Sequence, residues 1–489
     1  MSHAVNAVDP CPEHLRLRRD RRFAVVGGGR TGAAVAALLV REHAVVTVFD
    51  DGAIDVVTAG LLKHGLDTAT VNVRAGGMSA EALLDVDVIV LSPGVPRAHA
   101  AVQEALLAGI PLINELELGL AVLTNNGDHL DGVIVMAITG TNGKSTTTTM
   151  AGAIAKRRDP DAFVGGNLGV PLCEAINGGL VVGTVSAPRF VVVELSSYQL
   201  ETLSWFPVNA AAVTNLAPDH LDRYDNAEAY WAAKARLLTL VKPGGGVSLN
   251  AADAQSARTL GPALSAEVVP CHFDVSTGFA GIEVTAGALY LRTVDGAQEP
   301  VALDNPFIVG HHNRQNAAAA MAVAVLCGLR RDEIVGGLSD YAGIAHRLER
   351  VGVAGGVTWW NDSKATNVDA AVTALKSFAS GVHLIAGGVG KGAPYAPLVD
   401  AARECVRVVY SIGADAPAIE AAFADVDSIV VVPCVDLATA CARAVESCLP
   451  GEHIVLSPAC ASFDQFRDYN HRGVSFREQF ARYSVRGPR

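Results

Sequence analysis

The chain has 489 residues, of which half are apolar and 18% are charged, and its net charge is −12. This length exceeds what one hydrophobic core organises, because single cores stop growing near roughly 250–300 residues, so several domains are expected. No apolar run reaches the roughly 18 residues of a membrane-spanning helix, and the acidic balance disfavours nucleic acid as the main partner.

The cysteines and the N-terminal segment bear on the cellular compartment. The 9 cysteines are spaced too widely to form CxxC zinc or redox motifs. No apolar core or cleavage site follows the basic stretch His14–Arg22, so we interpret residues 1–22 as a solvated, partly ordered extension and not as a secretion signal. We therefore expect a cytoplasmic protein without structural disulfides.

The first folded segment has a dinucleotide-binding pattern. Phe23–Val26 is predicted to be a strand, Gly27–Gly32 a glycine turn, Ala33–Val40 a helix, and Val45–Phe49 a second strand that ends at Asp50. Such a turn places a diphosphate at a helix N-terminus, and the acidic residue meets a hydroxyl or a ring edge. These residues alone leave an NAD-dependent oxidoreductase and a UDP-binding domain both open.

A further strand is predicted at Val86–Leu91, before the loop Ser92–Pro96, which its two prolines restrain. The next strand, Val133–Ile138, leads into Gly140-Thr141-Asn142-Gly143-Lys144-Ser145 and a helix. Loop amides and a helix N-terminus form an anion cradle, in which a lysine meets the β- and γ-phosphates and a serine hydroxyl binds Mg²⁺. The segment departs from the full phosphate-loop pattern because Ile138 occupies its first glycine position.

Two later strands of this unit end in polar residues. Phe190–Val193 precedes Glu194, and a carboxylate at the C-terminal end of a parallel strand projects into the ligand crevice, where it can bind a metal. Ala210–Thr214 leads toward His220, and the predicted helix Ala229–Leu240 carries Lys234. Taken singly, Glu194 could be a surface residue, the histidine a core residue and the lysine a solvated one.

The remaining chain indicates a third α/β unit. Residues 247–304 read as a small antiparallel region, a helix resumes at Gln315–Leu326, and strands recur at Val382–Ile385, Val408–Ile412 and Ile454–Leu456. We predict three α/β domains at residues 23–125, 126–343 and 344–489, after the extension 1–22.

Eight segments, in order, together resemble the Mur ligases, most of all the branch that adds D-glutamate. They are GTNGKS (140–145), GGNLGVP (165–171), VELSSYQLE (193–201), NLAPDHLDRY (215–224) with the downstream Lys234, HHNRQN (311–316), HRLE (346–349), NDSKATN (361–367) and LSPACASFDQF (456–466). The resemblance runs from about Phe23 to the C-terminus. It implies an N-terminal Rossmann-like domain, a central P-loop ATPase-like domain and a C-terminal Rossmann-like domain.

The resemblance implies a ligase that uses ATP to join D-glutamate to UDP-N-acetylmuramoyl-L-alanine in peptidoglycan precursor synthesis. The carboxylate becomes an acyl phosphate, and the amine of D-glutamate then displaces phosphate to form an amide. The implied catalytic residues are Lys144, Glu194, His220 and Lys234. Ser145, Glu194, His220 and Lys234 would serve two Mg²⁺ sites, with Lys234 carbamylated by CO₂. A carbamate is an anionic oxygen ligand, whereas an ammonium repels the metal.

The resemblance also implies binding residues for each substrate. ATP is met by Gly140, Thr141, Asn142, Gly143, Lys144, Ser145, Thr146, Asn316, His346, Arg347, Asp362 and Lys364. The UDP-substrate is met by Arg30, Thr31, Asp50, Gly94, Asn167 and His220, and D-glutamate by Thr366, Lys391, Ser462, Phe463 and Tyr469. Two departures stand out, because the family often has Phe in place of Tyr469 and other members have Thr-Arg where this chain has Asp51-Gly52. A monomer acting on small molecules is expected.

Other classes remain open at this stage. An NAD-dependent oxidoreductase would leave GTNGKS and NDSKATN unexplained, and a non-enzymatic nucleotide-binding regulator would not need Lys234. A sister enzyme that adds another amino acid, or a folate polyglutamate ligase, would share the phosphate loop. The VELSSYQLE and LSPACASFDQF segments favour D-glutamate.

Overall fold

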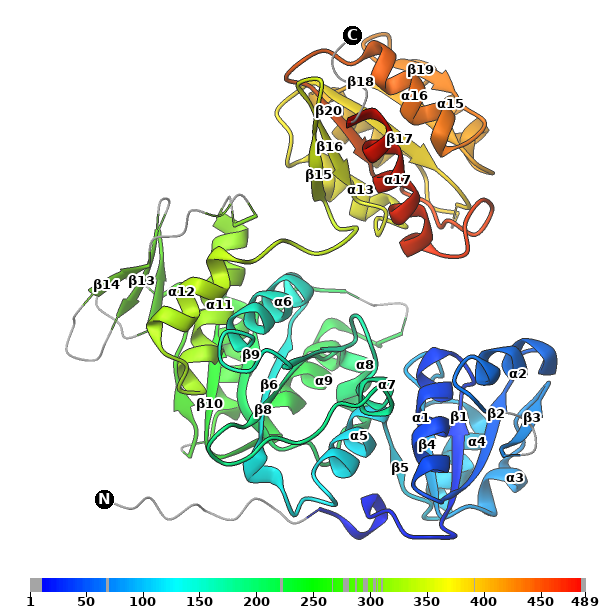
Figure 1. Ribbon diagram of the computed structural model, residues 1–489, viewed down its shortest axis with the longest axis vertical. Helices are drawn as coiled ribbons and strands as arrows, with labels where there is room; N and C mark the ends of the chain where they lie inside the picture. The colour runs from blue at the N-terminus through cyan, green and yellow to red at the C-terminus, as the bar shows by residue number, and fades with distance from the viewer. Residues whose placement is uncertain are drawn as a thin grey trace. The chain divides into compact units, whose positions relative to one another are not determined.

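A computed structural model describes residues 11–66, 70–219, 223–265, 267–275, 281–285, 288–292, 298–301, 305, 307–308, 311–390 and 392–484. Its contacts divide the chain into two compact units, Met1–Ala342 and Gly343–Arg489. The fold contains three sheets of five or six strands, one for each of the three predicted α/β segments (Figure 1). The α/β class predicted from the sequence is confirmed.

The first sheet is parallel, with strand order β3-β2-β1-β4-β5. Alternate residues of β1 face opposite sides: Phe23 and Val25 belong to one apolar cluster, and Ala24 and Val26 to another. Its strands are β1 (Arg22–Val26), β2 (Val45–Asp50), β3 (Asn72–Ala75), β4 (Val88–Leu91) and β5 (Leu112–Ile113), and its helices are α1 (Arg30–Arg41), α2 (Ile54–Leu62), α3 (Ala80–Leu84) and α4 (Ala100–Leu107).

The second sheet is also parallel, with order β11-β10-β9-β6-β8-β7. Both faces are covered, because helices α6 and α11 pack on one cluster and α5, α8 and α9 on the other. The strands are β6 (Val133–Thr139), β7 (Phe163–Gly166), β8 (Arg189–Glu194), β9 (Val208–Val213), β10 (Val241–Leu249) and β11 (Val269–Pro270). The helices are α5 (Glu115–Leu123), α6 (Lys144–Ala155), α7 (Leu172–Asn177), α8 (Ser197–Thr202), α9 (Ala227–Thr239), α10 (Ala254–Leu260), α11 (His311–Leu326) and α12 (Arg331–Ser339).

The chain enters a strand directly after α9. Lys242-Pro243-Gly244 lies within β10, which runs from Val241 to Leu249. The strand tolerates the proline because its pairing with β9 is interrupted between Val241 and Gly246. The small antiparallel sheet expected beyond it is confirmed as β12 (Gly281–Val284), β13 (Leu289–Arg292) and β14 (Gln298–Val301).

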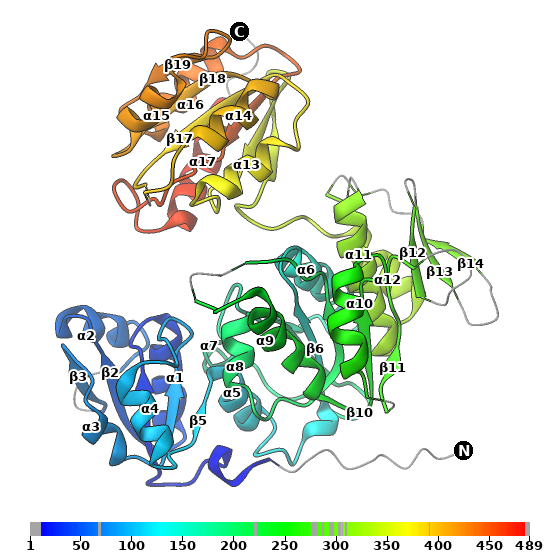
Figure 2. The ribbon, with the colours of Figure 1, turned by 180° about the vertical axis from the view of Figure 1, so that it is seen from behind.

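The third sheet forms the core of the second unit, with order β15-β16-β20-β17-β18-β19. Only the β15–β16 pairing is antiparallel. Helices α13, α14 and α15 pack on one face, and α16 and α17 on the other (Figure 2). The elements are β15 (Glu349–Ala354), β16 (Val357–Asn361), α13 (Val368–Leu375), β17 (Val382–Gly387), α14 (Ala396–Cys405), β18 (Val406–Ile412), α15 (Ala416–Phe423), β19 (Val430–Pro433), α16 (Leu437–Ser447), β20 (His453–Leu456) and α17 (Tyr469–Ser484).

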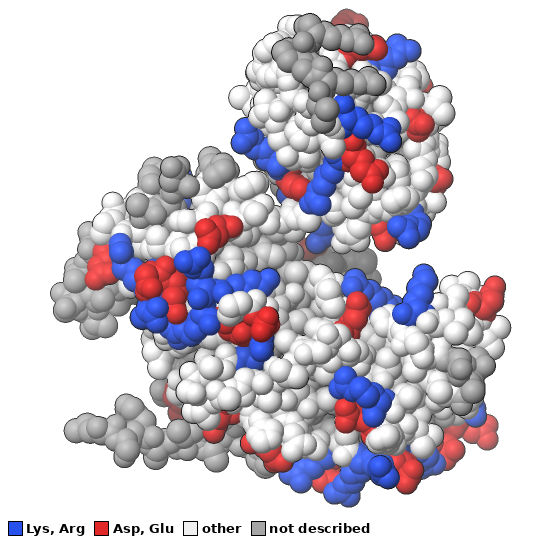
Figure 3. All heavy atoms as spheres, viewed as in Figure 1, with Lys and Arg blue, Asp and Glu red and all other residues white. Residues whose placement is uncertain are grey.

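The N-terminal segment is less solvated than its basic sequence suggested. Cys11 and Leu15 are buried in the core of the first unit, and the backbone N–H of Leu17 donates to Asn126 Oδ1 at 3.1 Å. Among the described residues, no helix is long and apolar enough to cross a membrane. Acidic and basic side chains are interspersed on the face shown in Figure 3.

Candidate active site

The phosphate loop connects β6 to α6, as predicted. Gly140 and Gly143 have φ values of 141° and 81°, and a Cβ on Gly143 would lie 2.2 Å from Asn316 Oδ1. Both positions therefore require glycine. Asn316, which the resemblance predicts to bind ATP, is buried on α11 against this loop. Lys144 Nζ donates to Thr141 O at 2.8 Å and so lies folded over the loop.

Glu194 ends β8 and is only 2% exposed. Its Oε1 accepts a hydrogen bond from Asn167 Nδ2 at 2.7 Å, whereas its buried Oε2 has no hydrogen-bond partner. A buried carboxylate oxygen without a donor is costly unless a cation neutralises it. Ser145 lies in the first turn of α6 and is also buried, so the two oxygen groups fit Mg²⁺, which prefers such ligands.

Lys234 is a fully buried cationic side chain, with an exposed fraction of 1%. Burial, and next the charge of Lys144, lower the pKa of its amine to about 7, although Asp219 and Glu194 oppose the shift. Its Nζ lies 4.5 Å from the centre of the Tyr230 ring. The structure therefore excludes a solvated helix lysine and brings Lys144, Glu194 and Lys234 together. His220 lies outside the described residues.

The first sheet carries a cavity of ≈ 480 Å³ at the glycine turn. Asp50 holds this turn, because its Oδ2 accepts the Gly28 N–H at 2.6 Å and its Oδ1 accepts the Gly52 N–H at 2.7 Å. Arg30 also lines the cavity, but it is paired with Glu174. Of the other residues predicted for the UDP-substrate, Thr31 is the second residue of α1 and Gly94 is exposed in the loop after β4.

Sequence reasoning missed Lys63 and His64, which line the same cavity. They lie at and just beyond the C-terminal end of α2, about 35 positions after the glycine turn. The motif carries no signal for them, because it specifies only the turn and the acidic residue.

In the second unit, the predicted ATP-contacting residues gather at the carboxyl end of β16. Asp362 is buried, and burial raises the pKa of its carboxyl to about 6. Its Oδ1 accepts the Leu348 N–H at 3.0 Å and its Oδ2 accepts the Ser457 hydroxyl at 2.7 Å. His346 has a φ of 62° and is also buried, and its carbonyl accepts the Lys364 N–H at 2.9 Å. Arg347 is exposed.

The residues predicted for D-glutamate lie near the same sheet edge. Ser462 is buried and Phe463 is 73% exposed. Thr366 follows β16 and Tyr469 begins α17, whereas Lys391 lies outside the described residues.

A buried cation that the sequence did not flag, Arg472, ties this edge together. Its Nε donates to Ser363 Oγ at 3.0 Å, and its Nη2 donates to Ser363 O at 2.9 Å and to Cys460 O at 3.0 Å. The guanidinium thus links the segments that follow β16 and β20.

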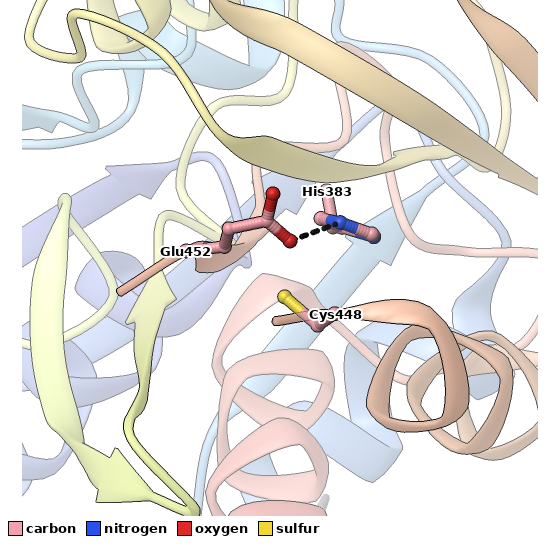
Figure 4. A group of neighbouring side chains, drawn as sticks. All are labelled: His383, Cys448 and Glu452. Atoms are coloured by element: carbon pink, nitrogen blue, oxygen red, sulfur yellow. Dashed lines mark hydrogen bonds and ion pairs between the residues drawn. The ribbon is translucent and has the colours of Figure 1, made fainter. Parts of the chain in front are cut away.

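A separate cluster in this unit has metal-ligand geometry. His383, Cys448 and Glu452 each place a ligand atom within 4.8 Å of the others (Figure 4). The Glu452 carboxylate is already satisfied, because Oε2 accepts His383 Nε2 at 3.1 Å and the Leu449 N–H at 2.8 Å, and Oε1 pairs with Arg407. The guanidinium would also repel a cation. We therefore interpret the cluster as a structural hydrogen-bond network.

Comparisons with known proteins identify the family. Three family descriptions match in order: "Mur ligase MurD-like, N-terminal domain" at residues 21–114, "Mur ligase middle domain" at 138–324, and "Mur ligase, glutamate ligase domain" at 346–460. This chain belongs to the Mur ligase family. Mur ligases use ATP and Mg²⁺, in agreement with the phosphate loop and the buried carboxylate.

Among similar proteins are two named UDP-N-acetylmuramoylalanine–D-glutamate ligase. The one from Myxococcus xanthus is 41% identical over 94% of this chain and 97% of its own length, and that from Anaeromyxobacter dehalogenans is 41% identical over 93% and 96%. The crystal structure of the alanine ligase MurC from Thermotoga maritima matches with a TM-score of 0.56 at 19% identity, covering 94% of this chain and 99% of MurC. That likeness shows the fold alone.

Proposed function

We propose that this chain joins D-glutamate to UDP-N-acetylmuramoyl-L-alanine, with cleavage of ATP to ADP and phosphate. The acceptor carboxylate attacks the γ-phosphorus, which releases ADP and leaves an acyl phosphate. The amine of D-glutamate then attacks the acyl carbon, phosphate leaves, and one proton passes to solvent. The observation that carries this proposal is the group of Lys144 and the buried Glu194 and Lys234 at the phosphate loop, in a chain 41% identical to ligases named for this reaction.

The protein groups at the loop have separable roles. Lys144 and the amides at the start of α6 would neutralise charge that develops on the β- and γ-phosphates. The Ser145 hydroxyl and Glu194 Oε2 would hold Mg²⁺, which supplies Lewis-acid stabilisation of the transferring phosphoryl group. Asn167 fixes the other oxygen of Glu194 and so orients the carboxylate.

Lys234 has the chemistry required for carbamylation. Only a neutral amine attacks CO₂, and the attack forms a carbamate and releases one proton. A pKa of about 7 leaves a large fraction of this amine neutral at physiological pH, whereas an ordinary lysine is almost wholly charged. The carbamate and His220 are the proposed ligands of a second Mg²⁺.

The second unit is proposed to supply the amino-acid site and to close on ATP. His346, Arg347, Asp362 and Lys364 would meet the nucleotide upon closure. D-glutamate carries two carboxylates, which a lysine and hydroxyl donors suit. The proposed pocket residues are Thr366, Lys391, Ser462, Phe463 and Tyr469.

The domain limits 23–125, 126–343 and 344–489 remain part of this proposal, as do a monomeric state and a cytoplasmic location. The UDP-substrate is assigned to the cavity at the glycine turn and to Asn167 beside the metal carboxylate.

One assay tests the function directly. Purified enzyme is given Mg²⁺, ATP and UDP-N-acetylmuramoyl-L-alanine, and phosphate release is measured with a panel of L- and D-amino acids. We expect release with D-glutamate only, together with a new amide detected by mass spectrometry. Release with another amino acid would indicate a related ligase that adds that amino acid. NAD-dependent absorbance change without ATP turnover would favour the oxidoreductase.

A further inference from the structure

Two helices of the first unit, α1 and α7, are joined by ion-pair and hydrogen-bond contacts. Arg30, the first residue of α1, forms a bidentate pair with Glu174 of α7, with Nε–Oε2 and Nη2–Oε1 distances of 2.8 and 2.9 Å. Its Nη1 also donates to Gly169 O at 3.2 Å. Bidentate pairing fixes the plane of a guanidinium, which a lysine cannot reproduce.

The same arginine is part of a ligand cavity. Arg30 lines the ≈ 480 Å³ cavity of the first sheet, together with Lys63 and His64. The pair with Arg30, and the nearby His64, lower the pKa of Glu174, so this carboxylate stays ionised at neutral pH. Glu174 therefore places a negative charge against Arg30 from α7, a helix that packs beside β7 of the second sheet.

A short series of contacts connects the Arg30–Glu174 pair to Glu194, the proposed metal ligand. Gly169, which Arg30 contacts, lies two residues from Asn167 in the segment that joins β7 to α7. Asn167 Nδ2 donates to Glu194 Oε1 at 2.7 Å, and its own N–H donates to Glu194 O at 2.9 Å. Gly166 cannot carry a side chain, because a Cβ there would lie 2.5 Å from Glu194 O. The segment is thus held at one end by Arg30 and at the other by Glu194.

We propose that Glu174 is a positioning residue, which acts through Arg30 and the Gly169–Asn167 segment to couple occupancy of the first-sheet cavity to metal binding at Glu194. The inference rests on the proposed function for the identity of the occupant, a UDP group. A diphosphate near Arg30 competes with Glu174 and Gly169 for the same guanidinium. Any shift of Arg30 is therefore transmitted to the segment that orients Glu194.

Binding of Mn²⁺, followed by electron paramagnetic resonance in the presence and absence of saturating UDP, tests this coupling. In the wild-type enzyme, we expect UDP to change the Mn²⁺ dissociation constant by at least about fivefold, the lower end of couplings between sites. Glu174→Gln keeps the shape of the side chain but removes its charge, and it should reduce the change to less than about twofold.

A matched control is available on the same pair of helices. Arg41 Nη1 donates to Ile176 O of α7 at 3.1 Å, but Arg41 does not line the cavity. Arg41→Gln should therefore keep the wild-type coupling. Arg30→Lys, which retains charge but not the bidentate geometry, should bind UDP and lose the coupling. Thermal unfolding of each variant checks that it is folded, and Arg30→Lys decides the matter if Glu174→Gln does not fold.

Three results would overturn the inference. These are wild-type coupling in Glu174→Gln or in Arg30→Lys, equal loss of coupling in Arg41→Gln, and a wild-type enzyme in which UDP leaves Mn²⁺ affinity unchanged. Failure of the proposed function would look different, since wild-type enzyme would then release no phosphate with D-glutamate.

Discussion

Replacement of Lys234 by methionine is expected to stabilise the ligand-free protein while abolishing its activity. The amine is buried, and its pKa falls from 10.5 to about 7 on folding. At about 1.4 kcal/mol per pKa unit, this shift corresponds to a penalty of about 5 kcal/mol, which is an upper bound. Methionine keeps most of the length of the side chain and removes the charge.

The sign of the pH dependence follows from the same shift. Because the folded protein binds the proton more weakly, the unfolded state carries more protons between pH 7 and 10.5, and stability rises with pH over this window. Below pH 7 the buried ammonium lowers the free energy of unfolding by the full amount. The Lys234→Met variant should therefore exceed the wild type in stability at pH 6, and the difference should shrink toward pH 10.

Urea unfolding at pH 6 and pH 9, in buffer purged of CO₂, measures this difference. Lys234→Ala should lose most activity, and formate or acetate should restore part of it by occupying the vacated oxygen-ligand position. Lys234→Arg should resist rescue, because a guanidinium stays cationic and fills the space. A methionine variant that is less stable than wild type at pH 6 would refute the buried-charge reasoning, and a fully active Lys234→Ala would refute the metal role.

Four further outcomes are expected. Lys144→Ala should abolish ATP-dependent phosphate release with unchanged thermal unfolding, so near-normal turnover would contradict the ATP site. Asn167→Ala should raise the half-saturating Mg²⁺ concentration about tenfold, and an unchanged Mg²⁺ dependence would contradict its role on Glu194. ATP analogue plus acceptor should reduce the radius of gyration in X-ray scattering, whereas identical profiles would contradict closure. The buried Glu117 carboxylate accepts hydrogen bonds from the N–H groups of Asn114, Ser204 and Trp205 and from the Ser204 hydroxyl. Glu117→Ala leaves these four donors without their acceptor and should lower the free energy of unfolding, measured in urea, by about 2–4 kcal/mol. A change below about 0.5 kcal/mol would contradict this expectation.

Three neighbouring strands of each large sheet could be predicted because parallel strands there are buried on both faces, whereas edge strands such as β3, β7 and β19 were not predicted. Segments such as Phe190–Val193 therefore appear as continuous apolar runs, and the turns between strands and helices carry glycine. The phosphate loop could also be predicted from the sequence, since its backbone conformation requires glycine at fixed positions. Local patterns of this kind need no knowledge of distant residues.

Pairings between distant residues could not be predicted in this way. Arg30 and Glu174 are 144 positions apart, and Arg472 and Ser363 are 109 apart. A single sequence contains no periodicity that links such positions. The burial of Lys234 could not be predicted with the same ease, although the lysine shares one face of α9 with the buried Tyr230, Ala233, Leu237 and Leu238. A long basic side chain on such a face usually carries its charge out to solvent, so only packing decides whether the amine is buried.

The charges at the phosphate loop are balanced only when the proposed ligands are bound. Lys144 and Lys234 lie together with the carboxylates of Glu194 and Asp219, so in the ligand-free protein the two lysines weaken the attraction of a divalent cation to the unpaired Glu194 oxygen. The proposed carbamylation would convert one of the two cations into an anion. Mg²⁺ would then become a favourable partner for both the carbamate and Glu194. Each component thus stabilises the others, and bicarbonate together with Mg²⁺ should raise the melting temperature more than the two added separately.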